Sequence, residues 1–242
     1  MIQIYQSVED TVKGIAEHLI QIGRECIIQN GSFTLVLSGG SSPKKLYELL
    51  ASENYKNKLN WTQVYFFFGD ERNVSKDDPG SNYRMIKEAF FDPLAINTNN
   101  IFSFDTSLIP HQAAEVYQET LSNFFKDKEY RFDLILLGLG DNSHTASLFP
   151  YTEILRQKIP LVSEVFLPDQ SVFRLSFNAP LINLATHISF LVYGSLKAPA
   201  VKHVLKDEIN IEEFPAQLIA PDQGEITWFL DKEAASLIDF NS

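Results

Sequence analysis

The stretch from Phe132 to Pro150 reads FDLILLGLGDNSHTASLFP. Its first half is apolar almost without alternation, which is typical of a strand buried on both faces of a parallel sheet. The run ends at Gly138 and Gly140 and continues into a polar loop that carries His144. Ligands of parallel α/β sheets bind beyond the carboxyl ends of the strands, so this loop is the first place to look for a functional site.

Other apolar runs along the chain have the same character, and amphipathic stretches separate them. Strands are expected at Phe33–Leu37, Gln63–Phe68, Phe132–Leu137, Val172–Phe177, Ile188–Tyr193 and Ile226–Leu230. Helices are expected from Val8 onward with Ser7 as N-cap, and at Pro43–Leu50, Asn82–Phe90, Gln112–Phe125 and Ala198–Leu205. This alternation predicts βαβ units and therefore an α/β fold, three-layer and Rossmann-like, with a mostly parallel central sheet.

Composition narrows the classes of protein that need to be considered. The 242 residues include 20 Lys and Arg against 31 Asp and Glu, which gives a formal net charge of −11, and 45% are hydrophobic. These values indicate a folded globular chain, and we expect a single domain over residues 1–242. The acidic balance argues against binding of nucleic acid or of an anionic membrane. An anionic substrate would need the few cations to be gathered at one place.

Cysteine and histidine usage bears on redox state and metals. Cys26 is the only cysteine, so no intramolecular disulfide and no cysteine zinc cluster is possible. None of the five histidines forms a His-x-x-x-His pair, so a histidine zinc site has no support. The N-terminal residues lack the pattern of a signal peptide, and no apolar run approaches the roughly 20 residues that span a bilayer. We therefore expect a cytoplasmic protein without a metal.

A glycine-rich segment, LSGGSSPK, follows the strand that ends at Leu37. Gly39 and Gly40 permit a tight turn and close approach of the backbone to a ligand. Ser42 fits an N-cap and Pro43 the first helical position. The resulting helix N-terminus suits a phosphate, although an ordinary capped turn would use the same residues. Neither the Walker A spacing nor the dinucleotide fingerprint matches.

The segment FGDERNV lies at the end of the next strand. Asp70, Glu71 and Arg72 place two carboxylates and one guanidinium at the carboxyl edge of the sheet. Arginine can bind a phosphate or a carboxylate through two parallel hydrogen bonds. The alternative is a solvated charged loop in which Ser81 or Asn82 caps the following helix.

The remaining polar groups are His144, Arg174 and Lys197. A neutral imidazole can act as a general base near pH 7, whereas a structural histidine would simply cap a helix. Ser147 follows three residues later, but the Gly-x-Ser-x-Gly pattern of a nucleophile elbow is missing. Arg174 falls within an expected strand and Lys197 follows another. A lysine there is usually solvated, and only the recurrence of polar groups at strand ends makes Lys197 a candidate for the site.

Together these segments resemble the bacterial-type 6-phosphogluconolactonases. The matching segments are SGGSSP at 38–43, GDERNV at 69–74 with SN at 81–82, GLG at 138–140 with HTASLFP at 144–150, and VYG at 192–194 with KA at 197–198. The resemblance implies a fold like that of glucosamine-6-phosphate deaminases and ribose-5-phosphate isomerases. It implies hydrolysis of 6-phospho-D-glucono-1,5-lactone in the pentose phosphate pathway, with no metal or cofactor. The oligomeric state stays open.

The resemblance also suggests roles for the residues. His144 would take a proton from water as it attacks C1, with Asp70 as the next candidate for the base. The oxyanion would be stabilised by Arg72 or by N–H groups of residues 138–142. The remaining assignments concern the phosphate, which would lie against Gly39, Gly40, Ser41 and Ser42, with Arg174 and Lys197 as counter-charges.

One departure from the family pattern concerns the residues before the histidine. The family usually reads Gly-x-Gly-x-Asp-Gly-His, and here Asn142 and Ser143 replace the Asp-Gly pair. An amide can orient the imidazole of His144 but cannot stabilise its charged form as a carboxylate would. Asp141 is an alternative carboxylate whose side chain would project differently. Ser143 indicates that the backbone at this position does not require glycine.

Two other functions are compatible with such a fold. Hexosamine-6-phosphate isomerases and deaminases carry Gly-His followed by Phe-Asn-Glu, with a catalytic glutamate. Here Phe149 stands at the fifth position after His144, so that carboxylate is missing. A non-catalytic sugar-phosphate sensor would need a DNA-binding region, and the chain has neither a basic patch nor spare length for one.

Overall fold

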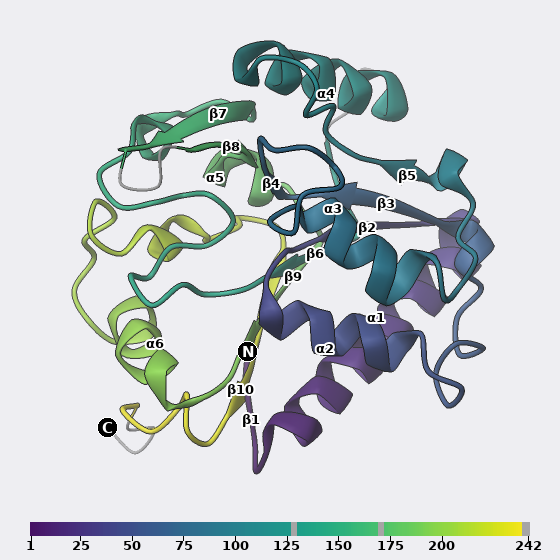
Figure 1. Cartoon of the computed structure of the whole chain (residues 1–242). Helices are drawn as coiled ribbons and strands as arrows, with labels where there is room; N and C mark the ends of the chain where they lie inside the picture. The colour runs from purple at the N-terminus through teal and green to yellow at the C-terminus, as the bar shows by residue number, and fades with distance from the viewer. Residues whose placement is uncertain (127–129, 169–171, 239–242) are drawn as a thin grey trace.

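The computed structural model describes residues 1–126, 130–168 and 172–238. Its centre is a seven-stranded sheet in the order β1-β10-β9-β6-β2-β3-β5, in which every neighbouring pair is parallel (Figure 1). The strands are β1 (Ile2–Tyr5), β2 (Phe33–Leu37), β3 (Val64–Phe68), β5 (Ile101–Phe102), β6 (Leu134–Leu137), β9 (His187–Val192) and β10 (Glu225–Asp231).

Helices cover both faces of this sheet, as parallel crossovers require (Figure 1). They are α1 (Val8–Asn30), α2 (Ser41–Leu50), α3 (Asn82–Ile86), α4 (Pro110–Phe125), α5 (Ala179–Ile182) and α6 (Ala198–Leu205), with a π-helical segment η2 (Lys87–Phe91) after α3. Shorter 3₁₀ turns are η1 (Trp61–Gln63), η3 (Thr98–Asn100), η4 (Glu153–Arg156), η6 (Ser195–Lys197) and η7 (Pro215–Leu218). The expected α/β fold with a mostly parallel central sheet is confirmed.

A smaller antiparallel sheet extends the carboxyl edge of the large one. It has the order β4-β8-β7, with β4 (Asp70–Arg72), β8 (Val172–Phe177) and β7 (Val162–Leu167). Gly69 joins the two sheets: its N–H donates to the carbonyl of Leu37 at 3.1 Å, and its own carbonyl accepts from the N–H of Phe177 at 2.8 Å. The residues of β4 are thereby held directly above the ends of β2 and β3.

The core explains why the apolar runs locate the strands. All residues of β2 are buried, and aromatic side chains fill the space between β3 and α4. The ring of Phe67 contacts Phe124 with centroids 5.0 Å apart, and the ring of Phe125 contacts Phe132 at 5.1 Å. Within the part of the chain that the structure describes, no helix combines the length and the apolar character needed to cross a bilayer.

The expected elements are confirmed to within a few residues, and Ser7 caps α1 by accepting from the N–H of Asp10 at 3.1 Å. One expected helix, Asn82–Phe90, is divided between α3 and η2. The short elements β1, β4, β5, β7 and α5 were not expected from the sequence.

Candidate active site

A cavity of about 300 Å³ opens at the carboxyl ends of β2, β3, β6 and β9. The glycine-rich loop lines one side of it, and Asp70, Arg72, His144, Arg174 and Lys197 complete the polar wall. The structure therefore brings together all the site residues predicted from the sequence except Asn142. Asn142 does not line the cavity, but its side chain hydrogen-bonds to His144.

The glycine-rich loop leads the chain from β2 into α2. Gly40 is the N-cap, with φ of 101°, a value that favours glycine, and Ser41 and Ser42 occupy the first helical positions. The expected N-cap at Ser42, with Pro43 as the first helical residue, is therefore wrong. Pro43 is instead the third residue of α2, where proline is tolerated because the N–H groups of the first turn have no intrahelical partner. Among the described residues no side chain caps this end, so the N–H groups of Ser41 and Ser42 are available to an anion.

His144 is held on three sides. Its Nδ1 lies 2.5 Å from Oδ1 of Asn142, and its ring stacks on Phe149 with centroids 4.1 Å apart. A Cβ on Gly140 would stand 2.0 Å from Nδ1, so only glycine leaves room for the imidazole. Because the Asn142 oxygen accepts a hydrogen bond, Nδ1 carries the proton and Nε2 keeps its lone pair. His144 does not cap a helix, since the chain turns back after it through a bridge between residues 145 and 148.

The environment keeps the imidazole of His144 neutral. Burial is the main cause that lowers the pKa of His144, and together with the positive charges of Lys197, Arg174 and Arg72, against the carboxylate of Asp141, it brings the pKa to about 4. At pH 7 the ring is uncharged and can accept a proton at Nε2.

The two residues that depart from the family pattern are explained by their backbone and contacts. Ser143 has φ of 61°, in the left-handed region where glycine is favoured. Serine occupies this position without glycine being required, as expected, but it adopts the left-handed conformation at an energetic cost. Asp141 pairs with Lys197, its Oδ1 lying 2.7 Å from Nζ, so Asn142 rather than Asp141 holds the imidazole of His144.

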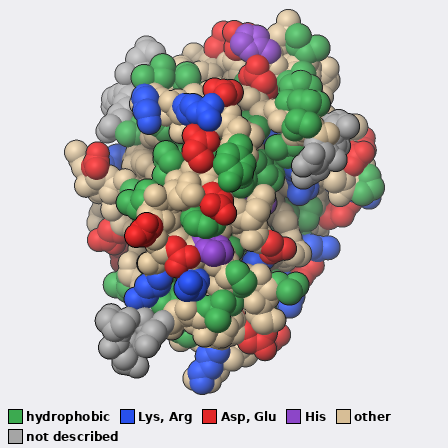
Figure 2. Space-filling view, turned by 90° about the vertical axis from the view of Figure 1, so that its left-hand side faces the viewer, with side chains coloured by type: hydrophobic (Ala, Val, Ile, Leu, Met, Phe, Trp, Pro, Cys, Tyr) green, Lys and Arg blue, Asp and Glu red, His purple; other side chains and the backbone are tan. Residues whose placement is uncertain are grey.

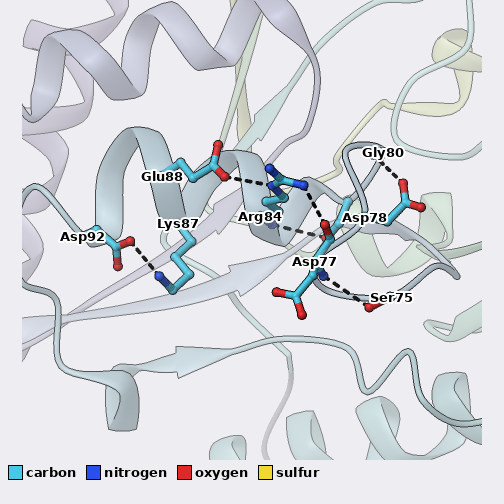
Figure 3. Close-up of polar contacts among 9 residues, drawn as sticks. Ser75, Asp77, Asp78, Gly80, Arg84, Lys87, Glu88 and Asp92 are labelled. Atoms are coloured by element: carbon cyan, nitrogen blue, oxygen red, sulfur yellow. Dashed lines mark hydrogen bonds and ion pairs between the residues drawn. The ribbon is translucent and has the colours of Figure 1, made fainter.

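Arg72 is oriented by the loop that connects β4 to α3. Its Nη1 donates to the carbonyl of Gly80 at 2.6 Å. The N–H of Gly80 in turn donates to Oδ1 of Asp78 at 2.7 Å, and Arg84 secures the loop through the carbonyl of Asp77 at 2.6 Å (Figure 3). Nε of Arg72 is buried and has no hydrogen-bond partner among the described residues. The guanidinium is thus fixed at one nitrogen.

Arg174 lies opposite Arg72 in the pairing of β8 with β4. Burial lowers the pKa of Arg174 from its ordinary value, and the charge of Arg72 lowers it further. Asp70 supplies a nearby negative charge. Burial raises the pKa of its carboxyl, opposed by both arginines and by Ser147, whose Oγ donates to Oδ2 at 2.8 Å.

Glu71 has a structural role outside the cavity. Its carboxylate accepts from the N–H groups of Asn82 and Tyr83 at 2.7 and 2.8 Å and from Oγ of Ser81 at 3.2 Å, so it anchors the start of α3. Ser81 caps α3, accepting from the N–H of Arg84, which confirms the cap of the alternative interpretation. Its solvated charged loop is wrong, because Asp70 and Glu71 are buried in β4.

Asn82 and Phe149 are among the lining residues that were not assigned to the site from the sequence. Asn82 could have been suspected from the SN pair in the resemblance, but that pair is equally typical of a helix cap. Phe149 belongs to the HTASLFP segment of the resemblance and stands where isomerases carry a carboxylate, but its stacking on His144 is visible only in three dimensions.

The cations of the site stand out against an acidic chain. Acidic and basic side chains are interspersed over the face shown in Figure 2, whereas the cavity collects Arg72, Arg174 and Lys197. Lys197 is 25% exposed in its side chain, and its partner Asp141 is 72% exposed. Across residues 1–126, 130–168 and 172–238, no three His, Cys, Asp or Glu side chains are grouped so that they could hold a metal ion. The site is suited to an anion.

Known proteins resemble this chain over nearly its whole length. Residues 6–228 match the family described as Glucosamine-6-phosphate isomerases/6-phosphogluconolactonase. A 6-phosphogluconolactonase of a Synechocystis species is 42% identical over 214 residues, which cover 87% of this chain and 86% of that protein. The 6-phosphogluconolactonase of Aggregatibacter actinomycetemcomitans is 35% identical over 228 residues, covering 92% and 97%.

Solved structures show the same likeness. The 6-phosphogluconolactonase from Trypanosoma cruzi superposes with a TM-score of 0.86 at 26% identity, covering 97% of this chain and 95% of that one. A monomeric glucosamine-6-phosphate deaminase of the NagB superfamily superposes with a TM-score of 0.80 at 23% identity, covering 98% and 99%, which is a likeness of fold.

Proposed function

The chain belongs to the family of glucosamine-6-phosphate isomerases and 6-phosphogluconolactonases, and from that membership we propose that it is a 6-phosphogluconolactonase. It hydrolyses 6-phospho-D-glucono-1,5-lactone to 6-phospho-D-gluconate in the pentose phosphate pathway. The observation that carries this choice is a neutral histidine in the same cavity as three cations. Because sugar phosphates are charged and need a carrier to cross membranes, we place the reaction in the cytoplasm.

The surroundings of His144 favour a lactonase over an isomerase. An isomerase or deaminase would use a carboxylate at the position of Phe149. Here that position presents an aromatic ring stacked on the imidazole, which leaves His144 as the proton acceptor beside the substrate.

The phosphate of the lactone is assigned to the N-terminal end of α2. The N–H groups of Ser41 and Ser42 would bind its oxygens, and the hydroxyls of both serines line the same wall. Arg174 and Lys197 supply counter-charges. The bound dianion would compete with Asp141 for the ammonium of Lys197, an exchange that is inexpensive because Asp141 is largely exposed.

His144 is assigned as the general base. Nε2 takes a proton from water as the water oxygen attacks C1, and the tetrahedral intermediate then breaks the bond between C1 and the ring oxygen. The proton passes to that oxygen, and the new carboxylic acid ionises. Asn142 keeps the other proton on Nδ1 throughout. The phosphate dianion offsets the cations that lower the pKa of His144, so substrate binding makes the imidazole a stronger base.

The oxyanion is assigned to Arg72. Among the backbone groups proposed from the sequence, the N–H of Gly140 is already used, because it donates to the carbonyl of His144 at 2.8 Å. Arg72 lines the cavity and, among the described residues, its guanidinium is held through Nη1 alone, which leaves other N–H groups for a developing negative charge.

Asp70 is assigned to charge compensation. Oδ2 accepts from Ser147, and Oδ1 lies 3.4 Å from Nδ2 of Asn82, so both oxygens are engaged with the protein, which disfavours Asp70 as the alternative base considered from the sequence. Its negative charge lies close to Arg72 and Arg174 and reduces the repulsion between them.

The test is a time-resolved NMR experiment on freshly prepared lactone. Because the lactone also opens spontaneously, decay of its signals is compared with and without the protein. Faster decay of the 1,5-lactone at catalytic amounts of protein supports the proposal. A decay identical to the buffer control, in a preparation that is folded by circular dichroism, contradicts it.

A further inference from the structure

Asn82 lies between the two halves of the site. It is the first residue of α3, is 2% exposed and lines the cavity. Its Nδ2 donates to the backbone carbonyl of Asp70 at 3.0 Å and lies 3.4 Å from Oδ1 of the same residue. One amide group therefore fixes both the backbone and the carboxylate of Asp70.

The other side of the same amide supports the glycine-rich loop. A Cβ on Gly39 would lie 1.9, 2.2 and 2.5 Å from Oδ1, Cγ and Nδ2 of Asn82, and these are the three nearest atoms. Gly39 does not have a positive φ, so its backbone would accept an alanine. Glycine is needed at this position because the chain rests directly on the amide of Asn82.

Asn82 is itself held rigidly. Its N–H donates to Oε1 of Glu71 at 2.7 Å, which ties the start of α3 to β4. Its Oδ1 is buried and has no hydrogen-bond partner within the described residues. A buried acceptor without a partner is costly, so an amide retained here points to a requirement other than stability.

We propose that Asn82 is a positioning residue that sets the spacing between the phosphate-binding loop at Gly39 and Asp70 with its two arginines. This inference rests on the proposed function, in which that loop binds the phosphate of the lactone. Through the amide, the loop of the large sheet and β4 of the small sheet are kept in one fixed arrangement.

The experiment measures the coupling between Gly39 and Asn82. Affinity for inorganic phosphate is measured by calorimetry for the wild type, Gly39→Ala, Asn82→Ala and the double variant. Asn82→Ala is expected to weaken phosphate binding about tenfold, and Gly39→Ala by at least as much, because the new methyl group displaces the loop. In the double variant the methyl group occupies the space left by the amide, so phosphate binds about threefold or more tighter than to Gly39→Ala.

The matched control is Asn178→Ala. Asn178 is likewise a buried asparagine at the start of a helix, with Nδ2 donating to the carbonyl of Ile159 at 2.7 Å, but it does not line the cavity. We expect this variant to lower the melting temperature and to leave phosphate affinity unchanged. If Asn82→Ala behaves in the same way, or if the double variant binds phosphate no better than Gly39→Ala, the positioning role is wrong.

A kinetic readout separates this inference from the proposed function. Asn82→Ala should raise KM for the phosphorylated lactone by a larger factor than it lowers kcat. The phosphate measurements use no lactone, so they hold whatever the wild type catalyses. If the variants show the expected coupling in phosphate binding but the wild type leaves the lactone unhydrolysed, the proposed function is contradicted and the positioning role of Asn82 is not.

Discussion

Arg72 and Arg174 are directly paired across β4 and β8, so two guanidinium groups emerge side by side at the wall of one cavity. Like charges opposite one another destabilise a sheet. Burial makes the charge of Arg174 still less favourable, which lowers its pKa. Asp70 offsets part of this charge. An anion in the cavity would offset more of it, which links ligand binding to the stability of the small sheet.

The first prediction concerns that link. Inorganic phosphate should raise the melting temperature above that in chloride at equal ionic strength. At ten times Kd the free energy of unfolding should increase by about 1.4 kcal/mol. Arg174→Gln removes one of the opposed charges, so its stability without phosphate should be preserved and its gain from phosphate should be smaller. Thermal scans of both proteins check this, and equal gains would show that the paired arginines do not hold the anion.

Replacing the proposed base should remove most of the activity. His144→Ala is expected to lower lactone hydrolysis by roughly 10²–10⁴, the range for loss of a general base, with the circular dichroism spectrum unchanged. The control is His203→Ala, because His203 contacts Asp207 and stacks on Phe214 away from the cavity. Near wild-type turnover in His144→Ala would assign the base to another group.

The counter-charges of the phosphate can be separated from the chemistry. Arg174→Ala and Lys197→Ala should each weaken binding of 6-phosphogluconate by roughly 1.5–3 kcal/mol, as for charge-assisted hydrogen bonds. Unphosphorylated gluconolactone should be a poor substrate whose turnover hardly changes in either variant. Titration calorimetry and rates on both lactones provide the comparison. An equal loss on the two lactones would mean that these residues act structurally.

The acid limb of the pH profile should respond to Asn142. Activity requires neutral His144, so wild-type kcat/KM should fall only as the pH drops toward its pKa of about 4. Asn142→Asp places a carboxylate against Nδ1, favours the protonated ring and raises this pKa. The limb should therefore move to higher pH, with activity retained above it. A profile with the limb unmoved, or moved to lower pH, rules out this electrostatic coupling.

The left-handed backbone at Ser143 gives a prediction about stability. Ser143→Gly relieves the conformational cost at φ of 61°, whereas Ser143→Ala keeps it. The glycine variant should be more stable than the alanine variant by roughly 1 kcal/mol, the reverse of their order in a helix. Urea denaturation of the two proteins measures the difference, and a more stable alanine variant would contradict the strain argument.

Much of the fold follows from one-dimensional patterns because the large sheet is buried on both faces. Runs such as Phe33–Leu37 are apolar except for Thr34, and burial of every side chain in β2 is the physical cause. β4 consists of Asp70, Glu71 and Arg72, whose composition is that of a loop. Its strand conformation comes from pairing with β8, which local propensity does not encode.

The site divides in the same way. His144 and the glycine-rich loop are recognisable because each follows a buried strand, and position relative to a strand end is a local property. The opposition of Arg72 and Arg174 depends on register between distant segments. The contact between Gly39 and Asn82 depends on where α3 begins in space. Neither is contained in spacing along the chain.

Gly69 gives the site a place late in the order of folding. Its N–H is bonded to the end of β2 and its carbonyl accepts from β8, so the register of the small sheet is tied to Leu37 of the large one. Pairing of β4 with β8 then closes a long loop, and such non-local closure is slow. We therefore expect the two arginines to meet after the large sheet has formed. A ligand that needs both of them should slow the unfolding of the native protein without increasing the rate at which it folds.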